Sequence, residues 1–406
     1  MLSELPATLL SAWESSDGVL YAVGGTATRA MVLRHDRDGW WEMDPGTTDT
    51  LWWVHGFSAM DVYAVGARGV VTHFDGTRWT VLREGGDETL FGAWGATKDQ
   101  LVAVGGVVTV SQPRATIVER SAGWNEVPTG GLPSGVALFK LWGRSPNELV
   151  VVGEKGLVAR GLPGAWTVEA TPTTERLTTV HGAGDALYAV GGLLEPVALR
   201  FVNGAWRRFA VPGTPQLLNG VAVSATGEAV LVGLEGYLAE GAVESFVMRA
   251  PLTRRGLHGV VATRSGFVAV GGDLLGSFGH GVVLARGDAL AGSSIQRWPW
   301  AGVPLDGGVE PEDAGADAGT DGGPPEPPDG GWLSPGASCD ERPGDCDPRL
   351  NLSCWFVFGP YKSYCGAACT DVSECGAYGA GACCKLPGPQ VTQTVCLPEI
   401  ACDAGT

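Results

Sequence analysis

The first 338 residues of this 406-residue chain contain no cysteine. This absence excludes disulfide bridges and thiolate-bound zinc from most of the protein. All ten cysteines instead lie between Cys339 and Cys402. An even number of cysteines at that density is typical of a disulfide-stapled module, which persists in an oxidising compartment. The partition predicts a large cysteine-free domain followed by a small cysteine-rich one.

An excess of positive charge is also missing. Residues 1–300 carry 23 basic and 28 acidic side chains, residues 301–338 carry eight acidic and no basic ones, and residues 339–406 carry four basic and eight acidic ones, which gives the net charge of −17. No stretch gathers lysine and arginine into a basic stripe. Nucleic acid and anionic membrane surfaces are therefore not expected as partners.

No apolar run reaches the length of a membrane span, so no transmembrane segment is predicted. Residues 1–6 likewise lack the charged and long apolar regions of a signal peptide. This conflicts with the export that the cysteines indicate. Two explanations stay open. Residues 1–6 add an outer strand to the fold, or the start lies inside a longer gene, and we favour the second.

Catalytic and cofactor-binding motifs are absent as well. The chain has no Gly-x-Ser-x-Gly nucleophile turn, no His-Glu-x-x-His zinc motif and no P-loop. His35, His73, His258 and His280 show no spacing typical of metal ligands. We therefore predict no catalytic residue, no metal site and no cofactor.

What the sequence has instead is a repeat of about forty residues. Seven short apolar runs end in Val-Gly, at residues 21–24, 63–66, 102–105, 150–153, 188–191, 230–233 and 268–271. Self-similarity at this period is the signature of a repeat architecture. Each run is apolar at every position, which indicates a strand with both faces buried between two neighbouring sheets.

Each repeat contains three further strand signals. A leucine leads the first strand, at Leu9, Leu51, Leu90, Leu138, Leu177, Leu218 and Leu257. A third apolar run follows the Val-Gly strand, and a glycine-rich turn then leads to an aromatic residue in the fourth strand: Trp40, Trp79, Trp124, Trp166, Trp206, Phe246 and Trp298. One such unit cannot bury its own faces, but seven in a ring can. We predict an all-β, seven-bladed β-propeller of four-stranded blades over residues 1–302.

One repeat carries a nameable turn. Residues 73–79, His-Phe-Asp-Gly-Thr-Arg-Trp, resemble a degenerate Asp-box of the BNR-type propellers. The tandem repeats of residues 1–300 also resemble those of bacterial secreted and surface proteins and, more distantly, photosystem assembly propellers. The resemblance implies the propeller architecture. Because the Asp-box is a structural turn in those families, and most repeats here keep its glycine but not its aspartate, it implies no catalytic activity.

An acidic segment rich in Asp, Gly and Pro follows at residues 303–337. This composition cannot bury enough apolar surface to offset chain entropy, so we predict a disordered spacer. Its Asp-Ala-Gly repeats match neither an EF-hand loop nor the RTX nonapeptide, which disfavours a calcium site.

The module over residues 338–406 has no histidine and no Cys-x-x-Cys pair, which favours disulfides over zinc. We predict five disulfides of open connectivity among Cys339, Cys346, Cys354, Cys365, Cys369, Cys375, Cys383, Cys384, Cys396 and Cys402. Residues 365–384 resemble a whey-acidic-protein four-disulfide core, although longer gaps flank the adjacent cysteine pair. That resemblance implies a protease inhibitor, and we favour a stapled binding or spacer module over it.

The loops between the second and third strands of the blades are the predicted binding surface. They differ in length: the third repeat expands its loop at residues 105–115, and the seventh has another long loop at residues 271–281. Insertions in a repeat array map to loops on one face, often the binding face. Six side chains are predicted to share this rim: Arg68, Arg114, Lys155, Glu195, Glu235 and Asp273.

Two further residue sets invite a functional interpretation. Arginine recurs near the end of the third strand, at Arg34, Arg120, Arg160, Arg200 and Arg286. Because a repeat copies its structural residues, we predict structural or solvated ion pairs there rather than an anion site. His55 and His181 occupy the slot filled elsewhere by Trp13, Trp94 and Trp142. We therefore predict that each packs between strands with one satisfied ring nitrogen.

Together these features predict a non-enzymatic recognition or adhesion protein at a bacterial cell surface or in the extracellular space. The propeller would present its loop rim to a protein or glycan, and we expect a monomer. Two alternatives stay open. A glycan-active hydrolase or lyase would have its site at the mouth of the propeller channel. An intracellular assembly-factor scaffold would keep its cysteines reduced.

Overall fold

The computed structural model describes residues 2–108, 112–274, 278–286, 290 and 294–298, and the backbone of four short strands nearer the C-terminus. The chain divides into two compact units, Met1–Trp298 and Pro299–Thr406. The predicted spacer at residues 303–337 lies outside the described residues.

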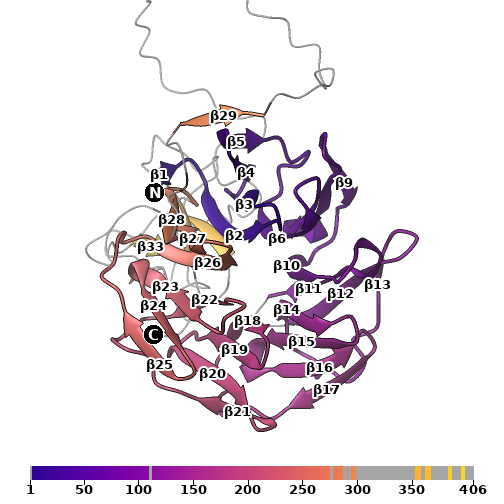
Figure 1. The fold of residues 1–406 in the computed structure, drawn as a ribbon, viewed down its shortest axis with the longest axis vertical. Coiled ribbons are helices and arrows are strands. Elements are labelled where there is room, and N and C mark those ends of the chain that lie inside the picture. The colour runs from indigo at the N-terminus through magenta and orange to yellow at the C-terminus, as the bar shows by residue number, and fades with distance from the viewer. Residues whose placement is uncertain are drawn as a thin grey trace, which may run out of the picture. The chain divides into compact units, whose positions relative to one another are not determined.

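The first unit is a ring of seven antiparallel sheets, which confirms the predicted seven-bladed propeller (Figure 1). In six blades the strands are hydrogen-bonded in chain order from the axis outward. The strands of the first three are β2 Thr8–Glu14, β3 Leu20–Gly25, β4 Ala30–Asp36 and β5 Gly39–Met43; β6 Leu51–Ser58, β7 Asp61–Gly66, β8 Val71–Phe74 and β9 Trp79–Arg83; and β10 Thr89–Trp94, β11 Val102–Val107, β12 Arg114–Arg120 and β13 Trp124–Glu126.

The next three blades repeat this order. Their strands are β14 Leu138–Ser145, β15 Glu148–Gly153, β16 Val158–Leu162 and β17 Ala165–Glu169; β18 Leu177–Ala183, β19 Ala186–Gly191, β20 Val197–Val202 and β21 Ala205–Arg208; and β22 Leu218–Val223, β23 Ala229–Gly233, β24 Leu238–Ala242 and β25 Ser245–Met248. Four short turns lie in the loops: η1 Ala67–Gly69, η2 Lys98–Gln100, η3 Glu154–Gly156 and η4 Leu234–Gly236.

The seventh blade joins the two ends of the ring. Its inner strands are β26 Gly256–Thr263, β27 Gly266–Gly272 and β28 Gly281–Arg286, and its outer strand is β1 Leu2–Leu5. Leu2 pairs with Val283 and Leu5 with Gly281, as the labels β1 and β28 show in Figure 1. Residues 2–5 therefore form the outer strand that one explanation predicts, and a start inside a longer gene stays a prediction.

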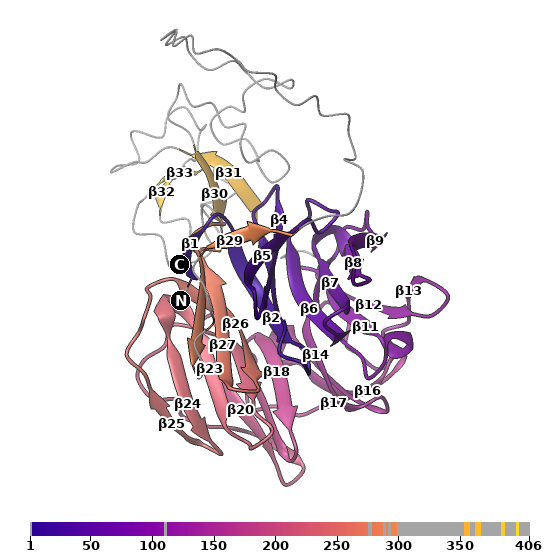
Figure 2. The ribbon, with the colours of Figure 1, turned by 45° about the horizontal axis from the view of Figure 1, so that its top comes forward.

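The position predicted for Trp298 is wrong. It was expected in the fourth strand of the seventh blade. Instead β29, Ile295–Arg297, pairs in parallel with β5 as a fifth strand of the first blade (Figure 2). Trp298 stacks edge-on against Trp41, with ring centroids 5.6 Å apart, and lies under the guanidinium of Arg34. The outer edge of β5 lets residues 295–297 form backbone hydrogen bonds with the first blade. In the seventh blade β1 already pairs with the outer edge of β28.

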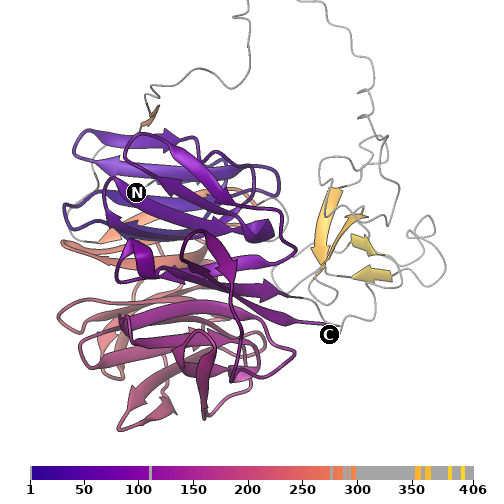
Figure 3. The same cartoon turned by 90° about the vertical axis from the view of Figure 1, so that its right-hand side faces the viewer.

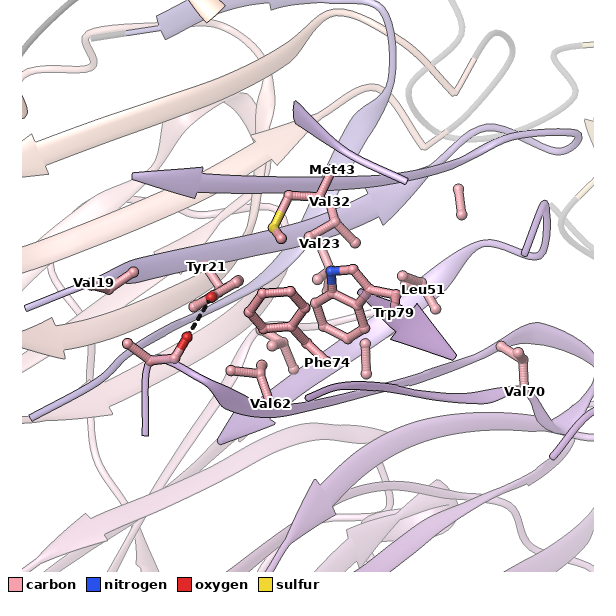
Figure 4. Close-up of a cluster of buried hydrophobic side chains, with 14 residues drawn as sticks. Val19, Tyr21, Val23, Val32, Met43, Leu51, Val62, Val70, Phe74 and Trp79 are labelled. Atoms are coloured by element: carbon pink, nitrogen blue, oxygen red, sulfur yellow. Dashed lines mark hydrogen bonds between the residues drawn. The ribbon is translucent and has the colours of Figure 1, made fainter. Parts of the chain in front are cut away.

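The core lies between blades, and Figure 3 shows the successive sheets stacked face to face. The second strand of each blade is buried along most of its length, as its continuous apolar sequence predicts. Between the first two blades Trp79 packs in a buried cluster with Tyr21 and Phe74, and the Tyr21 hydroxyl donates a 2.7 Å hydrogen bond to the carbonyl of Ala59 (Figure 4).

The fourth-strand aromatics have one shared role. Each packs against the blade that precedes its own, so that Trp79 seals the interface of blades 1 and 2 and Phe246 that of blades 5 and 6. The six residues that do so are Trp40, Trp79, Trp124, Trp166, Trp206 and Phe246. In each of these six blades the aromatic residue pairs with the third-strand residue that stands at the same position of the repeat.

Val243 offers a test of the hairpin geometry. It lies in the turn between β24 and β25 with φ of +60°, although other blades place Asn or Gly at positive φ in this turn. A β-branched residue is strained there, and the side chain is exposed. We expect Val243→Asn to raise the free energy of unfolding by about 1 kcal/mol in urea titrations. Val247→Asn, on extended backbone in β25, is the control and should instead be neutral or destabilising.

In the second unit the structure describes two hairpins. They are β30 Ser353–Val357 with β31 Lys362–Gly366, and β32 Cys383–Lys385 with β33 Val395–Leu397. Their registers place Cys354 opposite Cys365 and Cys384 opposite Cys396. Cys383 also lies in β32, and the other five cysteines are outside the described residues. The pairing of the five predicted disulfides stays a prediction.

Candidate functional site

The inner strand of every blade carries a β-bulge at the same place. In the first blade Leu9 pairs with Gly24 and Ser11 with Val23, which leaves Leu10 as an extra residue. The seven extra residues are Leu10, Trp52, Phe91, Phe139, Thr178, Asn219 and His258. Because the inner strands contact one another in sequence around the axis, these residues form a closed series, which we call the bulge ring.

The bulge ring varies where its surroundings do not. The residue before each bulge is leucine in all seven blades, and every one of these leucines is fully buried. The bulge position itself holds six residue types. A repeat keeps the side chains that packing requires, and bulges re-aim a side chain out of a regular ladder, often beside functional sites. Diversity at a geometrically fixed position therefore marks the bulge ring as the candidate site.

One arc of the bulge ring is aromatic. The rings of Trp52 and Phe91 meet edge to face with centroids 5.0 Å apart, and those of Phe91 and Phe139 lie 5.1 Å apart. Arg176 stands over Phe139 at 4.7 Å from the ring centroid and pairs with Glu154 at 3.2 Å. Trp52 and Phe91 are only half-buried, so this arc keeps apolar ring surface in contact with solvent.

The opposite arc is polar. The Thr178 hydroxyl lies 3.2 Å from the Leu218 and Asn219 carbonyls, and the Asn219 amide donates to the Leu257 carbonyl at 3.0 Å. His258 donates its Nε2 hydrogen to the Gly272 carbonyl at 2.9 Å, which leaves Nδ1 as an acceptor facing the Asn219 amide at 3.4 Å. Both imidazole nitrogens are thereby engaged, so His258 is not placed to act as a general base.

A buried amine lies beside the aromatic arc. The Lys140 Nζ donates to the Phe91 carbonyl at 2.8 Å and sits 3.8 Å from the centroid of the Trp53 ring. The aromatic face favours the charged amine, but burial outweighs it and lowers the pKa of Lys140 to about 7. At neutral pH this side chain is therefore only partly charged.

The histidines in the tryptophan slot behave as predicted. His55 donates from Nε2 to the Gly95 carbonyl of the next inner strand at 3.0 Å, and His181 Nδ1 accepts from the Val223 backbone amide at 3.1 Å. Trp13, Trp94 and Trp142 reach across to the next inner strand in the same way and cover its glycine. The slot is confirmed as an inter-blade packing position.

Burial depresses three imidazoles and gives the fold a pH dependence. Desolvation lowers the pKa of His55, His181 and His258 from 6.5 to about 4. The imidazoles of the unfolded chain take up protons near pH 6.5, whereas the native imidazoles stay neutral down to about pH 4. The contribution of these histidines to the free energy of unfolding is therefore fully present above pH 6.5 and is lost as the pH falls toward 4. We expect a loss of at most about 1.4 kcal/mol per pH unit for each histidine.

This loss is measured by urea denaturation between pH 7 and pH 4.5. The control variant is His181→Asn, whose side-chain oxygen can still accept from the Val223 amide but cannot titrate. The unfolding free energy of the variant should fall less steeply with decreasing pH than that of the wild type. The difference in slope should be the contribution of one titrating histidine, at most about 1.4 kcal/mol per pH unit. Equal slopes in the two proteins would contradict a neutral, buried His181.

The predicted rim residues lie on the loops between second and third strands, with one correction. Arg114 is the first residue of β12, because that hairpin extends its ladder to the Val107–Arg114 pair. Arg68, Lys155 and Glu235 each have φ near +55° and are followed by a glycine with positive φ, which is the geometry of a tight type I′ hairpin turn.

Each rim side chain has a partner in the chain itself. Lys155 donates to the Gly135 carbonyl at 2.9 Å, Gln216 donates to Glu235 at 2.9 Å, and Arg255 pairs with Asp273 at 2.6 Å. The remaining pairs are Arg68–Asp49 at 3.9 Å, Arg208–Glu195 at 3.3 Å and Arg114–Asp87. Except for Glu195, every rim residue contacts the connection that enters its own blade. The observed contacts of all six lie within the chain, and the rim as a binding surface stays a prediction.

The strand-three arginines are engaged as predicted. Arg160 bonds Glu148 at 2.8 Å and Glu169 at 2.6 Å, and Arg286 bonds Glu228 at 2.7 Å. Arg34 pairs with Asp36, Arg200 with Glu244 and Arg120 with the Tyr63 hydroxyl. Within the described part of the chain, no group of three or more His, Cys, Asp or Glu side chains is arranged to hold a metal. No helix there is long and apolar enough to span a membrane.

Comparison with known proteins bears on the fold. No family model and no curated protein matches the sequence. Among solved structures, virginiamycin B lyase from Staphylococcus aureus is similar over 69% of this chain and 96% of its own, with a TM-score of 0.56 and 13% identity. YCF48 bound to D1 peptide is similar over 66% and 91%, with a TM-score of 0.51 and 15% identity, and U3-55K over 66% and 89%, with 0.52 and 11%. At these identities the likenesses show the propeller fold alone.

Proposed function

We propose that this protein is a non-enzymatic recognition protein that binds a protein or a glycan with the bulge ring and the neighbouring rim loops. The observation that carries the proposal is the diversity of the bulge ring, which stands beside seven identical buried leucines. A purely structural repeat has no reason to place Trp, Phe, Thr, Asn and His at one geometric position.

The two arcs suit a ligand with both an apolar face and hydrogen-bonding groups. Half-buried aromatic rings on one side offer a stacking surface. On the other side the Asn219 nitrogen and the Thr178 hydroxyl already donate within the ring, which leaves the Asn219 side-chain oxygen and the Thr178 hydroxyl oxygen as acceptors for a ligand. A sugar ring or an aromatic peptide side chain has this character. Among the similar folds one is a propeller with a peptide bound, and another is a lyase. The engaged nitrogens of His258 count against a hydrolase or lyase here.

The test is binding of the full chain to a glycan array and to a peptide array, with Phe91→Ala and Asn219→Ala as variants. We expect wild-type signals on one array that fall about tenfold in both variants. Val168→Ala, on the outer strand β17 and exposed, is the control and should bind like the wild type. Equal binding by wild type and both variants would overturn the bulge ring as the site.

We also propose that the protein is exported and its ten cysteines are paired, from the density of cysteines after residue 338. Intact mass of native protein, with and without a thiol-alkylating reagent, tests this. Absence of adducts supports export, whereas ten adducts would favour the intracellular scaffold.

A further inference from the structure

The inner strands of the seven blades carry almost no charge. Histidines aside, their charged side chains are Glu14, Lys140 and Arg144. Glu14 is the last residue of β2, and Arg144 lies near the end of β14, where it pairs with Glu148 at 3.9 Å and Asp185 at 3.8 Å. Lys140 directly follows the bulge of β14. It is therefore the one charged side chain of the inner strands that lies beside the bulge ring.

Three blades hold the Lys140 side chain in place. It leaves blade 4, passes Gly92 of blade 3 and ends over the Trp53 ring of blade 2, 3.8 Å from the ring centroid. This path needs a glycine, because a side-chain carbon at Gly92 would lie 3.1 Å from Lys140 Cδ. The amine donates to the Phe91 carbonyl at 2.8 Å, so it contacts the backbone of the bulge ring. Lys140 is only 9% exposed, and its amine is thus fixed beside the aromatic arc.

The strands around Lys140 bring no carboxylate to its amine. Those that pack against β14 are β10, β11, β15 and β18, and the ring under the amine belongs to β6. Their titratable side chains are His55, His181 and Glu148. Glu148 lies at the far end of β15, opposite Ser145, and bonds Arg160 at 2.8 Å. Within the described part of the chain, the Lys140 amine therefore has no anionic partner.

The charged groups just before these strands are paired with one another. Glu88 precedes β10 and bonds Arg83 at 2.8 Å, and Arg176 precedes β18 and bonds Glu154 at 3.2 Å. A buried cation without an anion is costly, because nothing offsets the loss of its hydration. Burial accordingly lowers the pKa of Lys140 to about 7. An anionic group of a ligand would supply the missing charge at this place.

We propose that the bulge ring binds a glycan through a uronic acid, whose carboxylate meets the Lys140 amine while the sugar ring lies on the aromatic arc. This inference rests on the proposed function of the bulge ring and names its ligand class. An amine and a carboxylate form a charge-assisted hydrogen bond, and the C–H face of a sugar packs on aromatic rings. The glycan hydroxyls can donate to the acceptor oxygens of Asn219 and Thr178. A uronic acid is favoured over an acidic peptide, because its one rigid ring carries a carboxylate, an apolar face and hydroxyl donors together.

The probes are two trisaccharides that differ at a single carbon. One ends in glucuronic acid, and the other is its carboxyl-reduced counterpart, which ends in glucose. Binding of each probe to the full chain is measured by isothermal titration calorimetry at pH 7. We expect the wild type to bind the acidic probe about tenfold or more tightly than the neutral one, because only the acidic probe can pair with the amine.

Lys140→Met keeps the length of the side chain and removes the amine, so it should erase the preference for the acidic probe. Lys98→Met, at an exposed lysine of η2, is the matched control and should keep the full preference. Urea denaturation of the same variants separates binding from folding. Lys140→Met should be at least as stable as the wild type, because a buried amine without an anion is removed. A strongly destabilised Lys140→Met would mean that the amine holds the strands together, and would overturn the proposal.

The affinity for the acidic probe should also depend on pH. The free Lys140 amine is mostly charged at pH 6 and mostly neutral at pH 8. The uronate is ionised at both, and His55, His181 and His258 are neutral at both because their pKa lies near 4. Binding should therefore weaken about tenfold from pH 6 to pH 8 in the wild type and stay level in Lys140→Met.

Four results would overturn the proposal. They are no binding of the acidic probe, equal binding of the two probes, a preference that survives Lys140→Met, and a preference that appears only when residues 303–337 are deleted. The last would identify the acidic segment of the protein's own chain as the occupant. Array binding that falls in Phe91→Ala, together with equal binding of the two probes, would keep the bulge ring as the site and reject the uronic acid. Failure of the arrays as well would reject both.

Discussion

Leu5→Asp should destabilise the whole propeller by about 4 kcal/mol. Leu5 is 5% exposed and packs in the buried cluster that joins the first and seventh blades. It pairs with Gly281, so a strand from the first residues of the chain closes a ring whose last sheet lies more than 270 residues later. Aspartate removes the apolar contacts and buries a carboxylate in an apolar cluster, where the charged group loses its hydration.

The measurement is urea denaturation followed by the fluorescence of the 15 tryptophans. Leu252→Asp, at a side chain that is 72% exposed, is the control and should change stability by less than about 0.5 kcal/mol. Limited proteolysis should in addition cut Leu5→Asp first in blade 7, because an open ring frees that sheet. A Leu5→Asp protein as stable as the control would mean that β1 does not close the ring.

The repeat made the architecture predictable. Seven leucines, seven Val-Gly runs and six of the seven aromatics fall where the blades require them, since each copy must bury the same two sheet faces. The packing role of His55 and His181 followed from the same logic. A residue that exchanges with tryptophan in a repeat occupies the same inter-blade slot, and the structure places both there.

The deviations from the repeat were harder to predict. Trp298 follows Leu257 by 41 residues, whereas the other aromatics follow their leucines by 28 to 34. That excess was the signal that it belongs to another sheet. Its destination depended on a free edge at β5, which no local sequence reveals.

The candidate site was missed for a related reason. The rim hypothesis rested on loop length and stays a prediction, and five of the six rim side chains bond the connections that enter their own blades. The bulge ring left a weaker trace in the sequence, as one variable residue after each invariant leucine. A bulge changes the side that a residue faces, and strict alternation along a strand gives no warning of it.

The inner strands interlock, and the second large effect is expected there. A side-chain carbon added at Gly143 would lie 2.6 Å from the Trp94 ring of the preceding blade. Gly143→Val should therefore cost about 3 kcal/mol of unfolding free energy through steric overlap. Trp94→Ala should cost about 3 kcal/mol for the opposite reason, because it leaves a void over the glycine.

The double variant distinguishes interlocking from two independent defects. If the valine occupies space that the indole vacates, Trp94→Ala with Gly143→Val should be less destabilised than the sum of the single changes by about 1–3 kcal/mol. Trp13→Ala with Gly143→Val is the control, because Trp13 lies in the first blade and covers Gly56 instead. Its two effects should add. Additive costs in the Trp94 pair would show that the indole and the glycine do not share this space, and that the ring is held together elsewhere.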